Sequence, residues 1–278
     1  MAPPSLHSPR AIPRVAELQG LWRRLLISWP DGTRDETTQV RWLQGHSAYT
    51  DLRQPASLPT FSGKRGLLDL SMEDCTALAR QEGFAGHFRF DGGYFEWARS
   101  IDYQPKPIYS DVGSLWWGEG NVLIEQGRDI DYIEHWQRQD ATANTPAAAL
   151  TLRGTDCGTK ASLLRVGSVF MFARDRSIIP PPHKTLPECM AAATSIHEAR
   201  ALIDCEISFG ELGAEGFQIT ASSLPYRRGD ILNPRQSANH LMLRDRSPSG
   251  ADITRRWEIL AVEGDPLLIA AGTPRFGT

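Results

Sequence analysis

The chain has 278 residues, of which 41% are hydrophobic and 23% are charged, and its formal net charge is −3. This length is enough for one large unit or for two lobes with a hydrophobic core. A net charge this small gives no strong surface field, so nucleic acid is not expected as a partner. No stretch approaches the ~20 apolar residues that cross a bilayer, and residues 1–14 lack the apolar region of a signal peptide. The sequence therefore predicts a cytoplasmic protein without a membrane partner.

The first half alternates β-prone stretches with turn signals. Pro30-Asp31-Gly32 marks a turn between the first two stretches, and Asp91-Gly92-Gly93 supplies the positive φ angles of a tight hairpin. Ser71 to Asp74 is similar to a capping box and opens a helix that runs to Glu82. A flexible arm is expected at 1–16. Strands are expected at residues 21–27, 37–44, 47–52, 84–90, 94–101, 118–125 and 129–137.

In the second half, which follows a stretch of small residues at 140–149, β-prone stretches again alternate with turn signals. We interpret that stretch as a linker with its boundary near Asn144, which gives two lobes at 17–143 and 144–278. A capping box at Thr185 predicts a helix over 186–202. Further strands are expected at residues 150–154, 161–174, 203–209, 217–222, 239–244 and 254–262.

Closely spaced strands with one short helix in each half favour a mainly β fold with two successive antiparallel β-barrels. Gly20-Leu21-Trp22 resembles the G-x-W opening of lipocalin-like barrels of the calycin type, in which the aromatic residue plugs the closed end. Trp116 to Gly120 is similar to the W-x-G-x-G pattern of nitrobindin-type barrels. That pattern lies mid-chain here and no heme histidine can be assigned from position, so heme is the lesser alternative.

Further motifs resemble the fungal Hri-type proteins, which consist of two lipocalin-like barrels in one chain and have no settled biochemical activity. They occur in the same order as in that family, at Gly45 to Pro55, Asp111 to Gly120, Tyr132 to Gln137 and Leu152 to Gly167. The resemblance implies two successive lipocalin-like barrels in this chain.

The four cysteines, Cys75, Cys157, Cys189 and Cys205, lie far apart and form no C-x-x-C pair. Neither a zinc ribbon nor a disulfide framework is indicated, so we expect small, buried, apolar cysteines. Histidine spacings typical of metal sites, such as H-x-H or H-E-x-x-H, do not occur. The sequence predicts neither a metal nor a cofactor.

Aromatic residues make the first half the better candidate for a pocket, because seven of the eight tryptophans lie there. Small-ligand cavities are usually lined by aromatic side chains with a few polar groups. The alternative is that these side chains fill the ends of the barrel. The candidate ligand-binding residues are Trp42, Tyr49, Phe95, Trp97, Arg99, Trp117, Tyr132 and Trp136.

Charged residues share strand faces with these aromatic residues, because side chains alternate with a period of two. Asp51 and Arg53 follow Tyr49 on one face, and Glu134 lies between Tyr132 and Trp136 on another. If these faces point inward, Glu134 needs Arg53 or Arg99 as a partner, since an unpaired buried charge is costly. An outward salt bridge is the alternative.

Three functions remain open on this basis. The first is the binding of a small apolar or aromatic molecule in the first barrel, with the second lobe as support or as a dock for a protein partner. The second is a cofactor-free isomerase, cyclase or hydro-lyase that uses the catalytic candidates Glu134, Asp51 and Arg53. The third is a ligand-free interaction scaffold, which predicts filled barrels. A homodimer is also left open.

One motif of the second half belongs to none of these functions. The turn from Tyr226 to Asp230 carries two adjacent arginines, Arg227 and Arg228. Because arginine forks bind carboxylates well, this turn could close over an anionic ligand or contact a partner. A solvated loop is the alternative.

Overall fold

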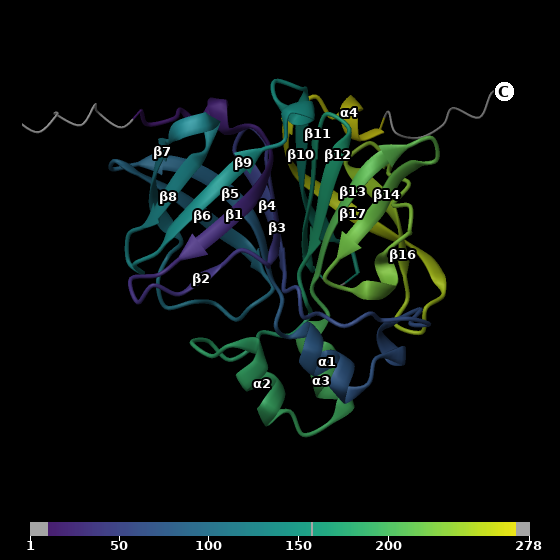
Figure 1. Cartoon of the computed structure of the whole chain (residues 1–278). Coiled ribbons are helices and arrows are strands. Elements are labelled where there is room, and N and C mark those ends of the chain that lie inside the picture. The colour runs from purple at the N-terminus through teal and green to yellow at the C-terminus, as the bar shows by residue number, and fades with distance from the viewer. Residues whose placement is uncertain (1–10, 157, 271–278) are drawn as a thin grey trace, which may run out of the picture.

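The computed structural model describes residues 11–156 and 158–270, and it shows two β-sheet units side by side above a group of helices (Figure 1). Within these residues, the strands of the first unit are β1 (Gly20–Ser28), β2 (Arg34–Asp35), β3 (Gln39–Gln44), β4 (Ala48–Gln54), β5 (Glu82–Asp91), β6 (Tyr94–Asp102), β7 (Val112–Trp117), β8 (Leu123–Gly127) and β9 (Ile133–Arg138). They pair antiparallel in the order β2-β1-β3-β4-β5-β6-β7-β8-β9. Since β1 also pairs with β9, eight of them form a closed barrel, and the short β2 extends its rim.

The second unit is an antiparallel half-barrel. In the described part of the chain its strands are β10 (Ala147–Gly154), β11 (Lys160–Val166), β12 (Val169–Arg174), β13 (Glu206–Gly213), β14 (Gly216–Ser222), β15 (Arg235–Ser237), β16 (His240–Arg246) and β17 (Asp252–Gly264). Their order is β14-β13-β12-β11-β10-β17-β16-β15, so the regular ladder stays open. Irregular backbone lies in the gap, because Leu232 donates to the carbonyl of Phe217 at 3.0 Å and accepts from the N–H of Arg244 at 2.7 Å.

Three short α-helices lie together beneath both units (Figure 1): α1 (Met72–Leu78), α2 (Leu186–Ala192) and α3 (Ile196–Ile203). A fourth α-helix in the described residues, α4 (Leu267–Ala270), lies at the opposite end, where it contacts β10. The predicted caps at Ser71 and Thr185 are confirmed, since each side chain accepts a backbone N–H three residues on. The single helix predicted over 186–202 is wrong: it breaks after Ala192, and Ser195 caps a separate α3. No helix in the described ranges is long and apolar enough to span a membrane.

The prediction of a mainly β protein with two successive antiparallel units is confirmed, with the correction that the second is a half-barrel. The hairpin at Asp91-Gly92-Gly93 is confirmed, and both glycines have positive φ. The single strand expected at 161–174 is a hairpin, because Gly167 turns the chain at a φ of 57°. The sequence did not predict β7 as a strand.

The predicted linker at 140–149 ends earlier than expected. Its last residues, Ala147 to Ala149, form the start of β10 and are buried. Ala147 and Ala149 belong to the apolar cluster between the units, whereas Ala148 faces the interior of the half-barrel. Small side chains here let two sheets approach closely, so the composition that resembled a linker is a packing feature.

Buried apolar side chains of the described residues form three clusters. One fills the closed barrel and one fills the half-barrel. The third lies between the units and the helices, where Leu43 and Leu52 of the barrel meet Leu164 and Met171 of the half-barrel. The two units therefore share a core.

The N-terminal segment and the cysteines complete the fold. The predicted arm falls partly on residues 1–10, which lie outside the described residues. Ala11 accepts the N–H of Trp117 at 2.9 Å, and Leu18 is fully buried against the barrel. Of the described cysteines, Cys75, Cys189 and Cys205 are buried and free, and Cys157 lies outside the described residues.

Candidate functional site

The predicted site residues converge on the interior of the first barrel. Alternate residues of β4 and β6, together with β9 and the residue that precedes it, project inward, as the period of two requires. These inward residues are Tyr49, Asp51 and Arg53, then Phe95, Trp97 and Arg99, then Tyr132, Glu134 and Trp136.

One half of this interior is filled with aromatic rings. The ring centroid of Trp42 lies 5.6 Å from that of Trp22, 5.7 Å from that of Trp97 and 5.4 Å from that of Trp136. Phe95 stacks on Phe88 at 5.4 Å. The predicted ligand-binding residues Trp42, Phe95, Trp97 and Trp136 are therefore packed against one another and do not line a pocket.

Trp117 and Tyr49 also lie outside the pocket that the remaining residues form. The ring of Trp117 packs 6.0 Å from that of Trp22, beside the aromatic cluster. Tyr49 is fully buried against Phe84, and its hydroxyl has no hydrogen-bond partner among the described residues. Both residues support the interior.

The other half of the interior holds a network of buried ion pairs. Glu134 is 2% exposed, and its Oε1 lies 2.7 Å from Nη1 of Arg24 and 3.5 Å from Nη1 of Arg53. Asp51, also 2% exposed, accepts a hydrogen bond of 2.9 Å from Nε of Arg53. Burial raises the pKa of Asp51 to about 6, although the charge of Arg53 opposes this shift. Arg53 therefore joins two buried carboxyl groups.

Glu125 is a further buried acid of this network. It is the register partner of Glu134 on β8 and β9, and it accepts hydrogen bonds from Tyr132 Oη at 2.8 Å and from Trp136 Nε1 at 3.0 Å. Burial and the charges of Glu134 and Asp111 raise its pKa well above the usual range. Burial and the neighbouring negative charges therefore favour the protonated form of the Glu125 carboxyl group.

Arg99 forms a second set of ion pairs at the same end of the barrel. Its guanidinium lies 2.9 Å from Asp102 and 2.6 Å from Asp111, and it covers the ring of Phe84 at 3.7 Å from the centroid. Its Nε is buried and has no hydrogen-bond partner in the described part of the chain. One donor of Arg99 thus remains unused.

These residues form the floor of a pocket at the open end of the barrel. The pocket has a volume of about 140 Å³. Its wall combines apolar residues with charged ones. The apolar residues include Ile27, Val112 and Ile130, and the charged residues are Asp111, Arg128 and Asp129. Its polar floor includes Arg53, Arg99, Tyr132 and Glu134. Four predicted residues, from β4, from β6 and from β9 with the residue that precedes it, thus meet in one pocket.

Two central members of the network, Arg24 and Glu125, are absent from the sequence prediction. The alternation of inward and outward side chains along each strand contains a signal for both residues. Arg24 follows the inward Trp22 by two residues, and Glu125 follows the inward Leu123 by two. A period of two assigns both residues to the interior face.

The two arginines of the turn at 226–230 lie in different environments. Arg227 is 1% exposed and forms ion pairs with Glu206 at 3.0 Å and Asp245 at 3.2 Å, so it belongs to the half-barrel itself. Arg228 is exposed and has no ion-pair partner in the described ranges. One arginine of the motif therefore stabilises the half-barrel, and the other is exposed to solvent.

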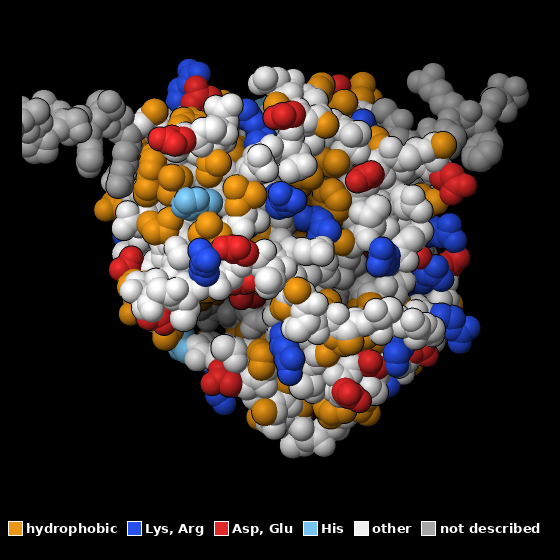
Figure 2. Space-filling model, in the orientation of Figure 1, with side chains coloured by type: hydrophobic (Ala, Val, Ile, Leu, Met, Phe, Trp, Pro, Cys, Tyr) orange, Lys and Arg blue, Asp and Glu red, His pale blue; other side chains and the backbone are white. Residues whose placement is uncertain are grey.

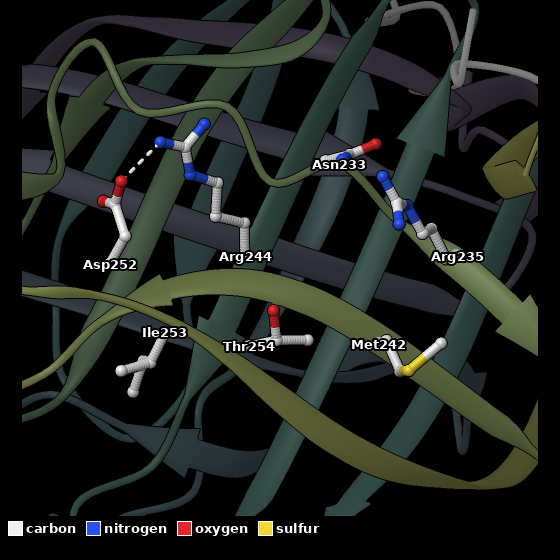
Figure 3. Close-up of a pocket in the computed structure, with 7 residues that line it drawn as sticks. All are labelled: Asn233, Arg235, Met242, Arg244, Asp252, Ile253 and Thr254. Carbon is white, nitrogen blue, oxygen red and sulfur yellow. Dashed lines mark hydrogen bonds and ion pairs between the residues drawn. The ribbon is translucent and has the colours of Figure 1, made fainter. Parts of the chain in front are cut away.

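A hollow of about 390 Å³ lies on the outer face of β16 and β17 (Figure 3). At one end Arg244 donates to Asp252 at 2.6 Å, and Arg235 lies beside Asn233 at the other end. All three charged side chains are exposed, and an exposed ion pair contributes little energy. We therefore place the candidate site in the first barrel.

Comparison with known proteins does not assign a family. No protein-family model matches the sequence, and no curated protein matches it. The chain is similar in structure to the uncharacterized protein YLR301w from Saccharomyces cerevisiae, with a TM-score of 0.49 and 13% identity. The similarity covers 88% of this chain and 98% of the yeast chain. A likeness at this level carries no inference about function.

Proposed function

We propose that the first barrel binds a small apolar or aromatic molecule in the pocket at its open end. The apolar body lies against Ile27 and Val112, and a polar substituent faces Arg99 and Tyr132. The observation that carries this proposal is a pocket of about 140 Å³ in which apolar side chains such as Ile27, Val112 and Ile130 lie beside a polar, ion-paired floor. Ligand sites commonly combine apolar side chains with a few fixed polar groups.

The size of the pocket limits the ligand. An apolar cavity of roughly 150 Å³ holds a benzene molecule, so this pocket accommodates about one small ring. The tryptophan cluster behind it is packed and offers no room. The ligand therefore enters at the mouth and stops at the charged floor. Its polar substituent carries an atom that accepts a hydrogen bond from Nε of Arg99, which has no other partner among the described residues.

A thermal-shift screen with single-ring compounds tests this proposal. We expect at least one compound among phenols, benzoates, anilines and cyclohexanols to raise the melting temperature, because a ligand stabilises the state it binds. Ile130→Trp fills the rim of the pocket and should abolish the shift. Ile130 is 54% exposed, so the substitution leaves the fold intact.

Ile108→Trp is the matched control for this screen. Ile108 is 69% exposed and lines a neighbouring surface hollow instead of the pocket. Its substitution should preserve the shift. The proposal is contradicted if no compound stabilises the protein, or if Ile130→Trp and Ile108→Trp respond alike.

A cofactor-free enzyme at the same pocket is the second candidate. Glu125 and Glu134 face each other across paired strands; burial raises the pKa of Glu125, whereas arginines hold Glu134. In enzymes that use one carboxyl group as an acid and a second as a base, the environments of the two groups commonly give them different pKa values. Tyr132 connects Glu125 to the pocket. The arrangement supports proton transfer in an isomerase, cyclase or hydro-lyase.

Incubation of a bound compound with the protein, followed by NMR, distinguishes catalysis from binding. An enzyme converts the compound, and both Glu134→Gln and Arg53→Met should slow the conversion by about 100-fold or more. Unchanged turnover in both variants would exclude these residues as catalytic groups. An unaltered compound in the wild type would leave binding as the function.

Two further expectations stay proposals. A ligand-free scaffold is consistent with the packed tryptophan cluster, and it predicts that the whole compound screen fails. Membership of the Hri-type family rests on the sequence motifs alone.

A further inference from the structure

A cleft separates the closed barrel from the half-barrel on the face shown in Figure 2. It has a volume of about 740 Å³ and is lined by β1 and β3 of the barrel and by β13 and β14 of the half-barrel. Basic side chains gather near the centre of this face, between the two units (Figure 2). The cleft is distinct from the pocket at the mouth of the barrel, which opens between other residues.

Three arginines of this cleft lack acidic partners among the described residues. Arg23 on β1 and Arg228 of the turn at 226–230 have no ion pair, and Arg41 on β3 donates only to the neutral Gln39, at 3.2 Å. The other charges in the cleft are mostly neutralised, because Arg24 pairs with Glu134 and Asp35, and Glu36 pairs with Arg34. Glu211 is the remaining acid of the cleft.

The three arginines are held close to one another. Arg23 and Arg41 are register partners on β1 and β3, so two like charges stand directly opposite across paired strands. Arg228 approaches from the half-barrel, and burial together with the charge of Arg228 lowers the pKa of Arg41. Such an arrangement destabilises the protein unless an anion occupies the space between them.

Arg41 is also held rigidly toward the cleft. Its guanidinium lies over the ring of Phe209, 5.5 Å from the centroid, which fixes its plane against the half-barrel. Its Nη1 is buried and has no hydrogen-bond partner in the described part of the chain. A buried guanidinium nitrogen without an acceptor is rare, because leaving it unsatisfied costs free energy.

We infer that this cleft between the units is a binding site for a phosphate-bearing small molecule, held by Arg23, Arg41 and Arg228. Guanidinium groups match the geometry of phosphate and bind it through paired hydrogen bonds. The charges favour a dianion, because three arginines and Glu211 leave an excess of two positive charges. The remaining volume accommodates a metabolite-sized body beside Thr220 and Phe209.

Titration calorimetry with inorganic phosphate, glucose 6-phosphate and glucose tests this inference. Both phosphate compounds should bind, and glucose should not. Arg41→Gln and Arg228→Gln should each weaken glucose 6-phosphate binding by about tenfold or more, because each removes a charge-assisted hydrogen bond. Arg153→Gln is the control, since this exposed arginine pairs with Glu258 outside the cleft.

A second measurement does not depend on a correct choice of sugar. In buffer without phosphate, Arg41→Gln should melt at the same temperature as the wild type or higher, because it relieves the repulsion with Arg23 and Arg228. A lower melting temperature would mean that Arg41 serves the fold. The inference is overturned by that result, by the absence of phosphate binding at millimolar concentration, or by unchanged affinity in the Arg41→Gln/Arg228→Gln double variant.

Discussion

Glu125 shows how the barrel interior changes the chemistry of a single residue. Its carboxyl group lies in the barrel wall between the tryptophan cluster and the ion-pair network, and both of its oxygens accept hydrogen bonds. Burial raises its pKa well above the ordinary value of 4.5, and the negative charge of Glu134 adds to this effect. The folded protein therefore holds the proton of Glu125 more tightly than the unfolded chain does.

The raised pKa of Glu125 predicts a pH-dependent stability. Because the folded state holds the proton of Glu125 more tightly than the unfolded state does, the contribution of Glu125 to stability falls as the pH rises above 4.5. Glu125→Gln carries no titratable proton and escapes this loss. As the pH rises above 4.5, the free energy of unfolding of Glu125→Gln should therefore gain on that of the wild type. Urea unfolding at several pH values measures this difference, and a constant difference would mean that Glu125 folds as a carboxylate.

The strand β6 shows why the network could be only partly predicted from a period of two. Phe95, Trp97 and Arg99 face the interior, but Ile101 belongs to the cluster between the units. The change of face occurs at a bulge, because Gly86 of β5 pairs with Arg99 while Ala85 pairs with Ile101.

Gly86 makes this bulge possible, and its substitution tests how much the close pairing of β5 and β6 contributes to stability. A Cβ atom at Gly86 would lie 1.9 Å from the carbonyl oxygen of Ala98, so alanine forces the two strands apart. Gly86→Ala should lower the free energy of unfolding by about 3 kcal/mol. Gly213→Ala is the matched control, since a Cβ there meets no atom within 4 Å. Equal stability of the two variants in urea would show that β5 and β6 tolerate separation at the bulge.

Local signals in the sequence predicted the elements whose causes are local. The hairpin at Asp91-Gly92-Gly93 depends on two glycines with positive φ, and the helix caps depend on single side chains. The start of β10 depends on a distant partner surface, so Ala147 to Ala149 could not be distinguished from a linker. For the site, alternation selected Arg53, Arg99, Tyr132 and Glu134, which share the pocket. The filling of the space around Trp42 depends on side chains from several strands and could not be predicted from any one.

The shared core makes the two units one molecule. Apolar residues of both units and of the helices pack in a single cluster, and α1 of the first half contacts α3 of the second. Glu263 of the half-barrel also accepts the backbone N–H groups of Ser47 and Ala48 in the barrel, each at 3.0 Å. Separation of the units would expose this core to water.

We therefore expect one cooperative unfolding transition. Tryptophan fluorescence reports mainly on the barrel, which contains seven of the eight tryptophans, whereas far-ultraviolet circular dichroism reports on both units. The two signals should give the same urea midpoint. Two midpoints would show that the barrel and the half-barrel unfold independently and that the cluster between them contributes little.

The pocket at the mouth of the first barrel opens onto Arg53, Arg99 and Glu134 of the ion-pair network. A crystal structure of the protein with a compound that raises its melting temperature tests the central proposal most directly. We predict that the compound lies between Val112 and Tyr132, with its polar group toward Arg99 and the tryptophan cluster unchanged. A compound bound at any other place, with this pocket empty, would contradict the proposed function.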